Sequence, residues 1–176
     1  AKNLEEEANK MADGYIISII GGKGGVGKSQ FAANLAFSYA QEGRYKPLLL
    51  DFDKAAGGDQ NLITGLKSPK NILELSQFSA ALDPRSIRQF TAVHKNGLSF
   101  IGMPSDPNHA DSIDVEALGK SLKAITQMFP ITIIDCGSEI NPLSMKALEF
   151  STLIFIVVST DLLALNQTRR LYSQLT

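Results

Sequence analysis

The stretch GGKGGVGKS at residues 21–29 follows directly after the apolar run at residues 15–20. From Gly22 to Ser29 it satisfies the phosphate-loop pattern, in which glycines let successive backbone N–H groups point at one phosphate group. The pattern indicates a phosphate loop when an apolar strand precedes it and an amphipathic helix follows it, and the sequence predicts both elements. The stretch therefore predicts an α/β fold that binds a nucleoside triphosphate with magnesium.

Each residue of this loop has an expected part in binding the phosphates. The helix that begins near Lys28 adds the positive potential of its N-terminal dipole. Lys28 should reach the β- and γ-phosphates, and the Ser29 hydroxyl should ligate magnesium. The expected nucleotide-binding residues are Gly22, Lys23, Gly24, Gly25, Val26, Gly27, Lys28, Ser29 and Gln30. A glycine-rich turn with surface lysines is the alternative.

The segment KGGVGKS at residues 23–29 resembles the deviant Walker A motif of the MinD/ParA family of P-loop ATPases, in the SIMIBI class. In that family the early lysine, here Lys23, reaches across an ATP-sandwiched homodimer to the phosphates held by the partner subunit. A cation supplied in this way stabilises charge on the transferring phosphoryl group, as an arginine finger does. The resemblance implies slow ATP hydrolysis that depends on dimerisation, with Lys23 and Lys28 as catalytic residues. A solvated surface lysine is the alternative for Lys23.

Three aspartates stand at the ends of predicted strands, where open α/β sheets bind their ligands. Asp51 and Asp53 follow the apolar run at residues 48–50, and Asp135 follows the run at residues 131–134. By the resemblance, Asp53 would orient or activate the attacking water as a third catalytic residue. Asp51 and Asp135 would join Ser29 around the magnesium, which keeps several of its waters. The alternative for each aspartate is a cap on the turn that follows.

Two positions depart from the family pattern. After the Walker B aspartate the family order is Asp-x-Pro-x-Gly, whereas residues 135–139 here read DCGSE. Gly137 therefore replaces the proline, and Glu139 replaces a glycine that lies near the γ-phosphate. Gln30 replaces a hydroxyl residue, but its backbone N–H can still serve the phosphates. We expect Cys136 to be a small, semi-buried residue rather than a metal ligand or redox group.

The composition is that of one soluble, globular domain. The chain has 176 residues, of which 44% are hydrophobic and 20% are charged, and its formal net charge is −1. This charge gives no electrostatic argument for sequence-independent nucleic-acid binding, which favours a basic face. The single cysteine excludes an internal disulfide bond, and neither a signal peptide nor an apolar run of membrane-spanning length is visible. We therefore expect a cytoplasmic protein.

Strands and helices alternate along the chain, which is typical of a mostly parallel sheet with helices on both faces, the three-layer P-loop NTPase architecture. Strands are expected at residues 15–20, 47–51, 98–103, 131–135 and 153–158, and most of them are continuous apolar runs typical of strands covered on both faces. Helices are expected at residues 28–42, 115–128 and 162 onward, with a short one after Asp83-Pro84. The first of these helices places Phe31, Leu35 and Tyr39 on one face.

The domain organisation follows from the same pattern. Residues 1–13 are acidic and helix-prone, and we interpret them as a linker or the tail of an upstream domain. Residues 14–176 form the ATPase domain. Family members usually continue past this point with adenine-recognition residues, so we expect a truncation at the C-terminal end.

Weaker motifs resemble the CpaE/TadZ pilus-assembly branch of the family. Residues 51–59 end in Gly-Asp, and residues 157–171 lead into an Arg-Arg-Leu helix, as they do in that branch. The resemblance implies a localisation or assembly switch for a pilus or secretion machinery, with protein partners at the cell pole or inner membrane surface. The alternatives are a nucleotide-binding scaffold with little hydrolysis and a partition or flagellar-positioning ATPase. Membrane association is possible in the family but is not encoded in this stretch.

Overall fold

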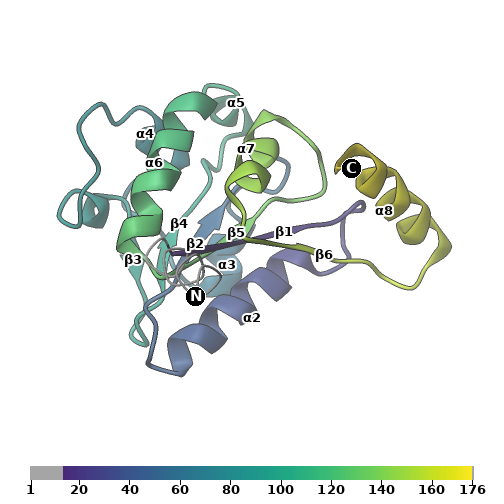
Figure 1. Ribbon diagram of the computed structural model, residues 1–176, viewed down its shortest axis with the longest axis horizontal. Helices are drawn as coiled ribbons and strands as arrows, with labels where there is room; N and C mark the ends of the chain where they lie inside the picture. The colour runs from purple at the N-terminus through teal and green to yellow at the C-terminus, as the bar shows by residue number, and fades with distance from the viewer. Residues whose placement is uncertain (1–13, 176) are drawn as a thin grey trace, which may run out of the picture.

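The computed structural model describes residues 14–175, so the expected linker at residues 1–13 lies outside the described residues (Figure 1). Its strands form one six-stranded sheet in the order β3-β4-β2-β5-β1-β6. Neighbouring strands are parallel except for the short pair β3 and β4. The strands are β1 (Tyr15–Ile20), β2 (Leu48–Asp51), β3 (Ala92–Val93), β4 (Ser99–Ile101), β5 (Ile131–Asp135) and β6 (Leu153–Ile156). The predicted, mostly parallel α/β sheet is confirmed.

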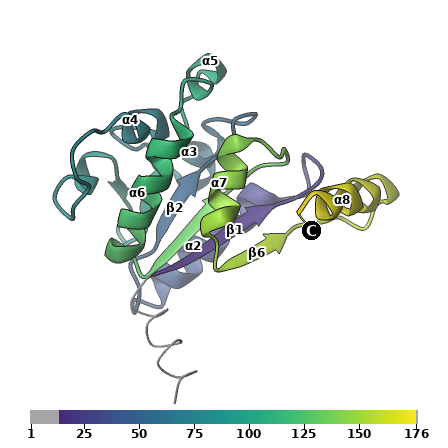
Figure 2. The ribbon, with the colours of Figure 1, turned by 45° about the horizontal axis from the view of Figure 1, so that its top comes forward.

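Helices cover both faces of this sheet, which gives the three predicted layers. Figure 2 shows α6 and α7 side by side over one face, whereas α2 lies on the other. The helical segments are α2 (Lys28–Gln41), α3 (Asp59–Thr64), α4 (Ile72–Ser76), the 3₁₀ turn η1 (Ile87–Gln89), α5 (Pro107–Ala110), α6 (Val115–Met128), α7 (Pro142–Phe150) and α8 (Leu162–Leu175). Alternate residues of β1 point to opposite faces, so Ile16 and Ile20 join the core under α6 and α7. Ile17 and Ile19 join the core under α2.

The buried face of α2 differs from the expected one. We expected an apolar face of Phe31, Leu35 and Tyr39, but none of these three side chains is fully buried. The fully buried apolar face is made of small residues, namely Ala32, Ala33, Ala36 and Ala40. Because alanine side chains are small, this face allows the helix backbone to pack close to the sheet. Helical spacing in the sequence fits both faces, and only the packing distance decides between them.

Strand β6 is also less covered than expected. Its apolar run predicted a strand covered on both faces, but Leu153, Ile154 and Phe155 are 48%, 39% and 37% exposed. In the part of the chain that the structure describes, β6 is the edge of the sheet, paired with β1 alone. The difference has a topological cause. An apolar composition shows that a strand can be buried on both faces, but the position of the strand in the sheet decides whether other elements cover it.

Two helix caps and one short helix show how the local structure compares with the sequence. Asp114 caps α6 by accepting a bond from the Ala117 N–H, and Asp161 caps α8 by accepting a bond from the Ala164 N–H. The helix predicted after Asp83-Pro84 is wrong in type. The Asp83 carboxylate accepts from the N–H groups of Arg85 and Ser86, which closes a turn that leads into η1. The short elements α3, α4, α5, α7 and β3 were not predicted.

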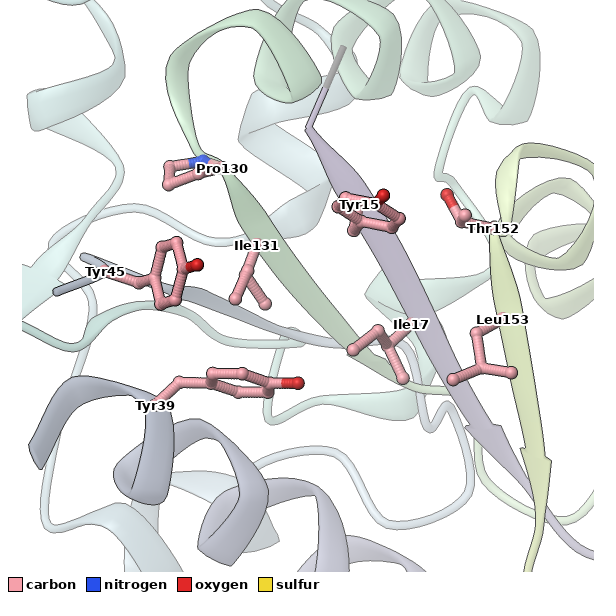
Figure 3. Close-up of a pocket in the computed structure, with 8 residues that line it drawn as sticks. All are labelled: Tyr15, Ile17, Tyr39, Tyr45, Pro130, Ile131, Thr152 and Leu153. Atoms are coloured by element: carbon pink, nitrogen blue, oxygen red, sulfur yellow. The ribbon is translucent and has the colours of Figure 1, made fainter. Parts of the chain in front are cut away.

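A large apolar pocket lies at the opposite end of the sheet from the phosphate loop (Figure 3). Its volume is about 480 Å³, and its lining residues are Tyr15, Ile17, Tyr39, Tyr45, Pro130, Ile131, Thr152 and Leu153. Tyr15, Ile131 and Leu153 are the first residues of their strands, so the pocket opens at the amino ends. Parallel α/β sheets bind nucleotides at the carboxyl ends, so this pocket is not the candidate nucleotide site. Among the described residues, no helix has the length and apolar character needed to cross a lipid bilayer.

Candidate nucleotide site

The phosphate loop and two of the predicted aspartates meet at the carboxyl ends of the central strands. The loop connects β1 to α2, and β1 pairs with β5. In turn, β5 pairs with β2 in a register that places Asp135 beside Asp51. The sheet order therefore brings together three segments that are far apart in the sequence.

The second half of the loop forms an open cradle. A Cβ atom added at Gly24, Gly25 or Gly27 would meet no heavy atom within 4 Å. Gly25 and Gly27 have φ angles of 76° and 92°, a conformation that L side chains rarely adopt. Gly27 is the N-cap of α2 and no side chain caps that end, so the first N–H groups of the helix face this space. Open space in front of an uncapped helix N-terminus fits a phosphate group.

The first half of the loop needs glycine for a different reason. A Cβ at Gly22 would lie 2.5 Å from the backbone carbon of Gln167 and 2.6 Å from the nitrogen of Thr168, both in α8. A Cβ at Gly21 would lie 2.6 Å from the carbonyl oxygen of Val157. These glycines permit close packing of the loop against the β6–α8 region, and the phosphate-loop pattern alone does not reveal this.

The two lysines of the loop point to different places. Lys28 is buried, and its Nζ donates to the carbonyl oxygen of Lys23 at 3.0 Å, inside its own loop. Lys23 is half-exposed, and its Nζ forms an ion pair with the Asp161 carboxylate at 3.0 Å. The Ser159 hydroxyl, the Ala164 N–H and Lys23 all donate to Asp161 and lower the pKa of its carboxyl group. The ammonium group of Lys23 is therefore paired with the cap of α8, whereas that of Lys28 bonds inside the loop.

Asp51 and Asp135 form a buried pair of carboxylates. Burial raises the pKa of Asp51 well above its ordinary value, and the neighbouring Asp135 charge raises it further. Burial also raises the pKa of Asp135, against hydrogen bonds from the Ser29 hydroxyl and the Gln60 amide that lower it. The Asp51 Oδ2 atom is buried and accepts no hydrogen bond from the described residues.

This pair fits a hydrated divalent cation. An unpaired, buried carboxylate oxygen beside a second carboxylate is an arrangement that a cation stabilises. Within residues 14–175, no group of three or more His, Cys, Asp or Glu side chains is placed to enclose a metal ion. A few oxygen ligands with several retained waters are what Mg²⁺ prefers, so Ser29, Asp51 and Asp135 fit magnesium.

Asp53 lies next to this pair and explains one departure from the family pattern. Its Oδ1 accepts bonds from the N–H groups of Ala55 and Ala56, so the carboxylate caps the turn after β2. A Cβ at Gly137 would lie only 2.6 Å from the Asp53 Cγ, and Gly137 has a φ of 69°. Proline cannot adopt that φ, so glycine is required where the family pattern has proline. Glu139 is exposed.

The Cys136 thiol and the Gln30 side chain are not part of the carboxylate pair, and Cys136 is fully buried rather than semi-buried as expected. Cys136 is fully buried in the core, and burial raises the pKa of its thiol to about 12. A thiol held in this way is inert as a nucleophile or metal ligand at neutral pH. The Gln30 side chain is exposed and donates to Asn34 Oδ1, so the backbone N–H of Gln30 remains the group expected to face the phosphates.

Gln60 is a site residue that sequence reasoning missed. It lies in the first turn of α3, it is 1% exposed, and its amide contacts both Ser29 and Asp135. No motif marks it, because a polar residue after two glycines is typical of a solvent-exposed turn. The one signal that the sequence offers for Gln60 is its position, because it follows Asp53 by only a few residues.

Comparison with known proteins gives consistent results. Residues 14–176 match the family model of an AAA domain, AAA_31. The chain is 29% identical over 163 residues to the flagellum site-determining protein YlxH of Helicobacter pylori. The aligned region covers 91% of this chain and 53% of that protein. The chain thus spans about half the length of this curated relative.

Two solved structures resemble the fold closely. A ParA family ATPase from Chlorobium tepidum has a TM-score of 0.81 at 21% identity, covering 93% of this chain and 67% of that chain. The septum site-determining protein MinD of Pyrococcus horikoshii, complexed with Mg-ADP, has a TM-score of 0.75 at 22% identity, covering 92% of this chain and 64% of that chain. These likenesses show the three-layer P-loop fold, and the family model spans all of the residues that build it. The chain therefore belongs to the AAA_31 family of AAA domains.

Proposed function

We propose that this chain binds Mg-ATP in the cradle of its phosphate loop and forms a homodimer around two ATP molecules. In this proposal residues 22–30 hold the phosphates, and Lys28 neutralises the β- and γ-phosphate charge of its own nucleotide. Ser29, Asp51 and Asp135 hold magnesium, which screens the phosphate charge when bound. The open cradle and the unpaired oxygen of Asp51 support this assignment.

The position of Lys23 carries the proposal of a dimer. Lys23 belongs to the phosphate loop, yet its ammonium group is paired with Asp161 at the molecular surface, and Lys28 occupies the loop interior. A half-exposed lysine at the rim of the cradle is available to a second subunit that docks against this rim. There it would stabilise the charge that develops on the partner's γ-phosphate during hydrolysis.

The Lys23→Ala variant tests this role directly. It should retain ATP binding, because Lys28 and the cradle remain, and it should lose the ATP turnover of the dimer. Loss of one such charge contact corresponds to a decrease in turnover of roughly 100-fold or more. Exposed Lys120, on α6 away from the loop, offers a control: Lys120→Ala should leave turnover unchanged. Wild-type turnover in Lys23→Ala would refute the role.

Asp53 is proposed to orient the water that attacks the γ-phosphate. Its Oδ1 is fixed by two backbone N–H groups, and Gly137 lies against the carboxylate, so its position is well defined. The competing possibility is a scaffold that binds nucleotide and hydrolyses it little, with Asp53 serving only as a turn cap. A phosphate-release assay on the wild-type protein separates the two, since a scaffold would release no phosphate above the rate of a Lys28→Ala control.

In the cell, we infer a localisation or assembly switch whose ATP-bound dimer binds a partner and whose hydrolysis releases it. The Gly-Asp ending of residues 51–59 and the helix after Asp161 favour the CpaE/TadZ branch, with a pilus or secretion machinery at the pole or inner membrane. The likeness to YlxH favours flagellar positioning as the second candidate. A fluorescent fusion followed in strains that lack either the pilus or the flagellar basal body would distinguish them.

A further inference from the structure

Gln60 connects three parts of the candidate site that come from different regions of the chain. One amide hydrogen of its Nε2 group is donated to the Ser29 carbonyl oxygen at 2.9 Å, in the first turn of α2. The other is donated to Asp135 Oδ2 at 2.8 Å, at the end of β5. Because both partners are acceptors, the orientation of the amide is fixed, and both of its donors are used.

The surroundings of Gln60 make this connection rigid. The side chain is 1% exposed, so water cannot replace either bond. Its helix begins at Asp59, and the N-cap residue Gly58 has a φ of 98° that turns the chain into α3.

The same side chain has one unused group. Gln60 Oε1 is buried and accepts no hydrogen bond from the described residues. A buried acceptor of this kind costs free energy unless a donor reaches it. A water in the hydration shell of a bound cation is a donor of the required chemistry, since Mg²⁺ keeps most of its waters.

We propose that Gln60 is a positioning residue for the magnesium site: its amide fixes the Asp135 carboxylate relative to Ser29. This inference rests on the proposed function, since it assigns Asp135 and Ser29 to magnesium. In this proposal Gln60 contacts neither the nucleotide nor the reacting atoms. It acts through Asp135, so its loss should weaken magnesium binding more than nucleotide binding.

The test measures the affinity for a fluorescent ATP analogue as a function of Mg²⁺ concentration, and again in EDTA. Gln60→Met keeps the length of the side chain and removes both donors. It should raise the Mg²⁺ concentration for half-saturation roughly tenfold, the effect of one hydrogen bond to a charged group, and leave the affinity in EDTA within about twofold of wild type. Thr64→Val is the matched control, because the Thr64 hydroxyl bonds to the Gln60 carbonyl oxygen within the same helix. It should lower the melting temperature and leave the Mg²⁺ dependence unchanged.

Each outcome of this experiment either supports or overturns the positioning role of Gln60. Equal losses of affinity with and without Mg²⁺ in Gln60→Met, or an unchanged Mg²⁺ dependence, would overturn the positioning role while leaving the nucleotide site intact. If Gln60→Met does not fold, Gln60→Asn serves instead, since its shorter side chain keeps the donors but cannot reach both acceptors. It should shift the Mg²⁺ dependence in the same direction, and no shift would overturn the inference. A wild-type protein that binds the analogue equally well in Mg²⁺ and EDTA would refute both the proposed magnesium site and this inference.

Discussion

Substitution of Gly24 separates the phosphate cradle from the fold that carries it. A Cβ added at Gly24 meets no heavy atom within 4 Å, and the residue has no positive φ. Gly24→Ala should therefore leave the free energy of unfolding within about 0.5 kcal/mol of wild type, as substitutions in open space usually do. The added methyl group would instead occupy the space where the phosphates are proposed to lie.

The expected loss of affinity follows from the hydrogen bonds that the methyl group displaces. A hydrogen bond to a charged group contributes about 1.5–3 kcal/mol, so loss of two backbone N–H bonds to phosphate costs about 3 kcal/mol or more. This corresponds to a decrease in ATP affinity of roughly 100-fold. The melting temperature should change by less than about 2 °C.

Gly22→Ala should, unlike Gly24→Ala, destabilise the fold. Its Cβ would lie 2.5 Å from the Gln167 backbone, so α8 or the loop must shift. Overpacking of this kind costs about 1–3 kcal/mol, which lowers the melting temperature by roughly 2–12 °C. Fluorescence anisotropy with a labelled ATP analogue and thermal denaturation measure the two effects side by side. Gly24→Ala with ATP affinity within threefold of wild type would refute the assignment of the cradle, as would parallel losses of affinity and stability.

Three further substitutions test the carboxylates and their neighbours. Asp51 has a raised pKa, so the folded state binds its proton more tightly than the unfolded chain does, and stability falls as pH rises from the ordinary pKa of 3.8 through the raised value. Asp51→Asn should therefore raise the melting temperature at pH 7 without magnesium and weaken Mg²⁺-dependent ATP binding; a lower melting temperature would contradict this. Asp53→Ala should retain ATP binding and release no phosphate, and normal release in an enzyme-coupled assay would remove Asp53 from the mechanism. Gly137→Ala should destabilise the fold by about 1–3 kcal/mol in urea denaturation, because its φ is 69° and its Cβ would lie against Asp53, and a neutral result would contradict that packing.

The sequence predicts the parts of this fold that depend on local pattern. Strands β1 and β5 match their predicted bounds at both ends, because apolar runs that end in glycine or aspartate mark buried strands directly. The caps Asp114 and Asp161 were also predictable, since a cap depends on residues within one turn. The alanine face of α2 was not, because the closeness of a helix to a sheet is set by both partners.

The candidate site likewise has some features that local sequence pattern predicts and others that only tertiary packing determines. The phosphate loop and the aspartates at strand ends follow from spacing alone, and the sheet order brings Asp51 beside Asp135 as expected. The contact of Gln60 with Asp135 joins residues 75 positions apart, and the ion pair of Lys23 with Asp161 joins residues 138 positions apart. No local pattern encodes such distant pairs, so only the packed structure reveals them. Gly137 departs from the family pattern in the sequence, and the Asp53 carboxylate that lies against it explains this departure.

The central claim is that ATP, with magnesium, joins two copies of this chain through the rim that carries Lys23. Sedimentation velocity of the Asp53→Ala variant, which should bind ATP without consuming it, tests this claim most directly. We predict a monomer without nucleotide and with Mg-ADP, and twice that mass with saturating Mg-ATP. A mass that stays at the monomer value under Mg-ATP, while the labelled nucleotide co-sediments with the protein, would contradict the account.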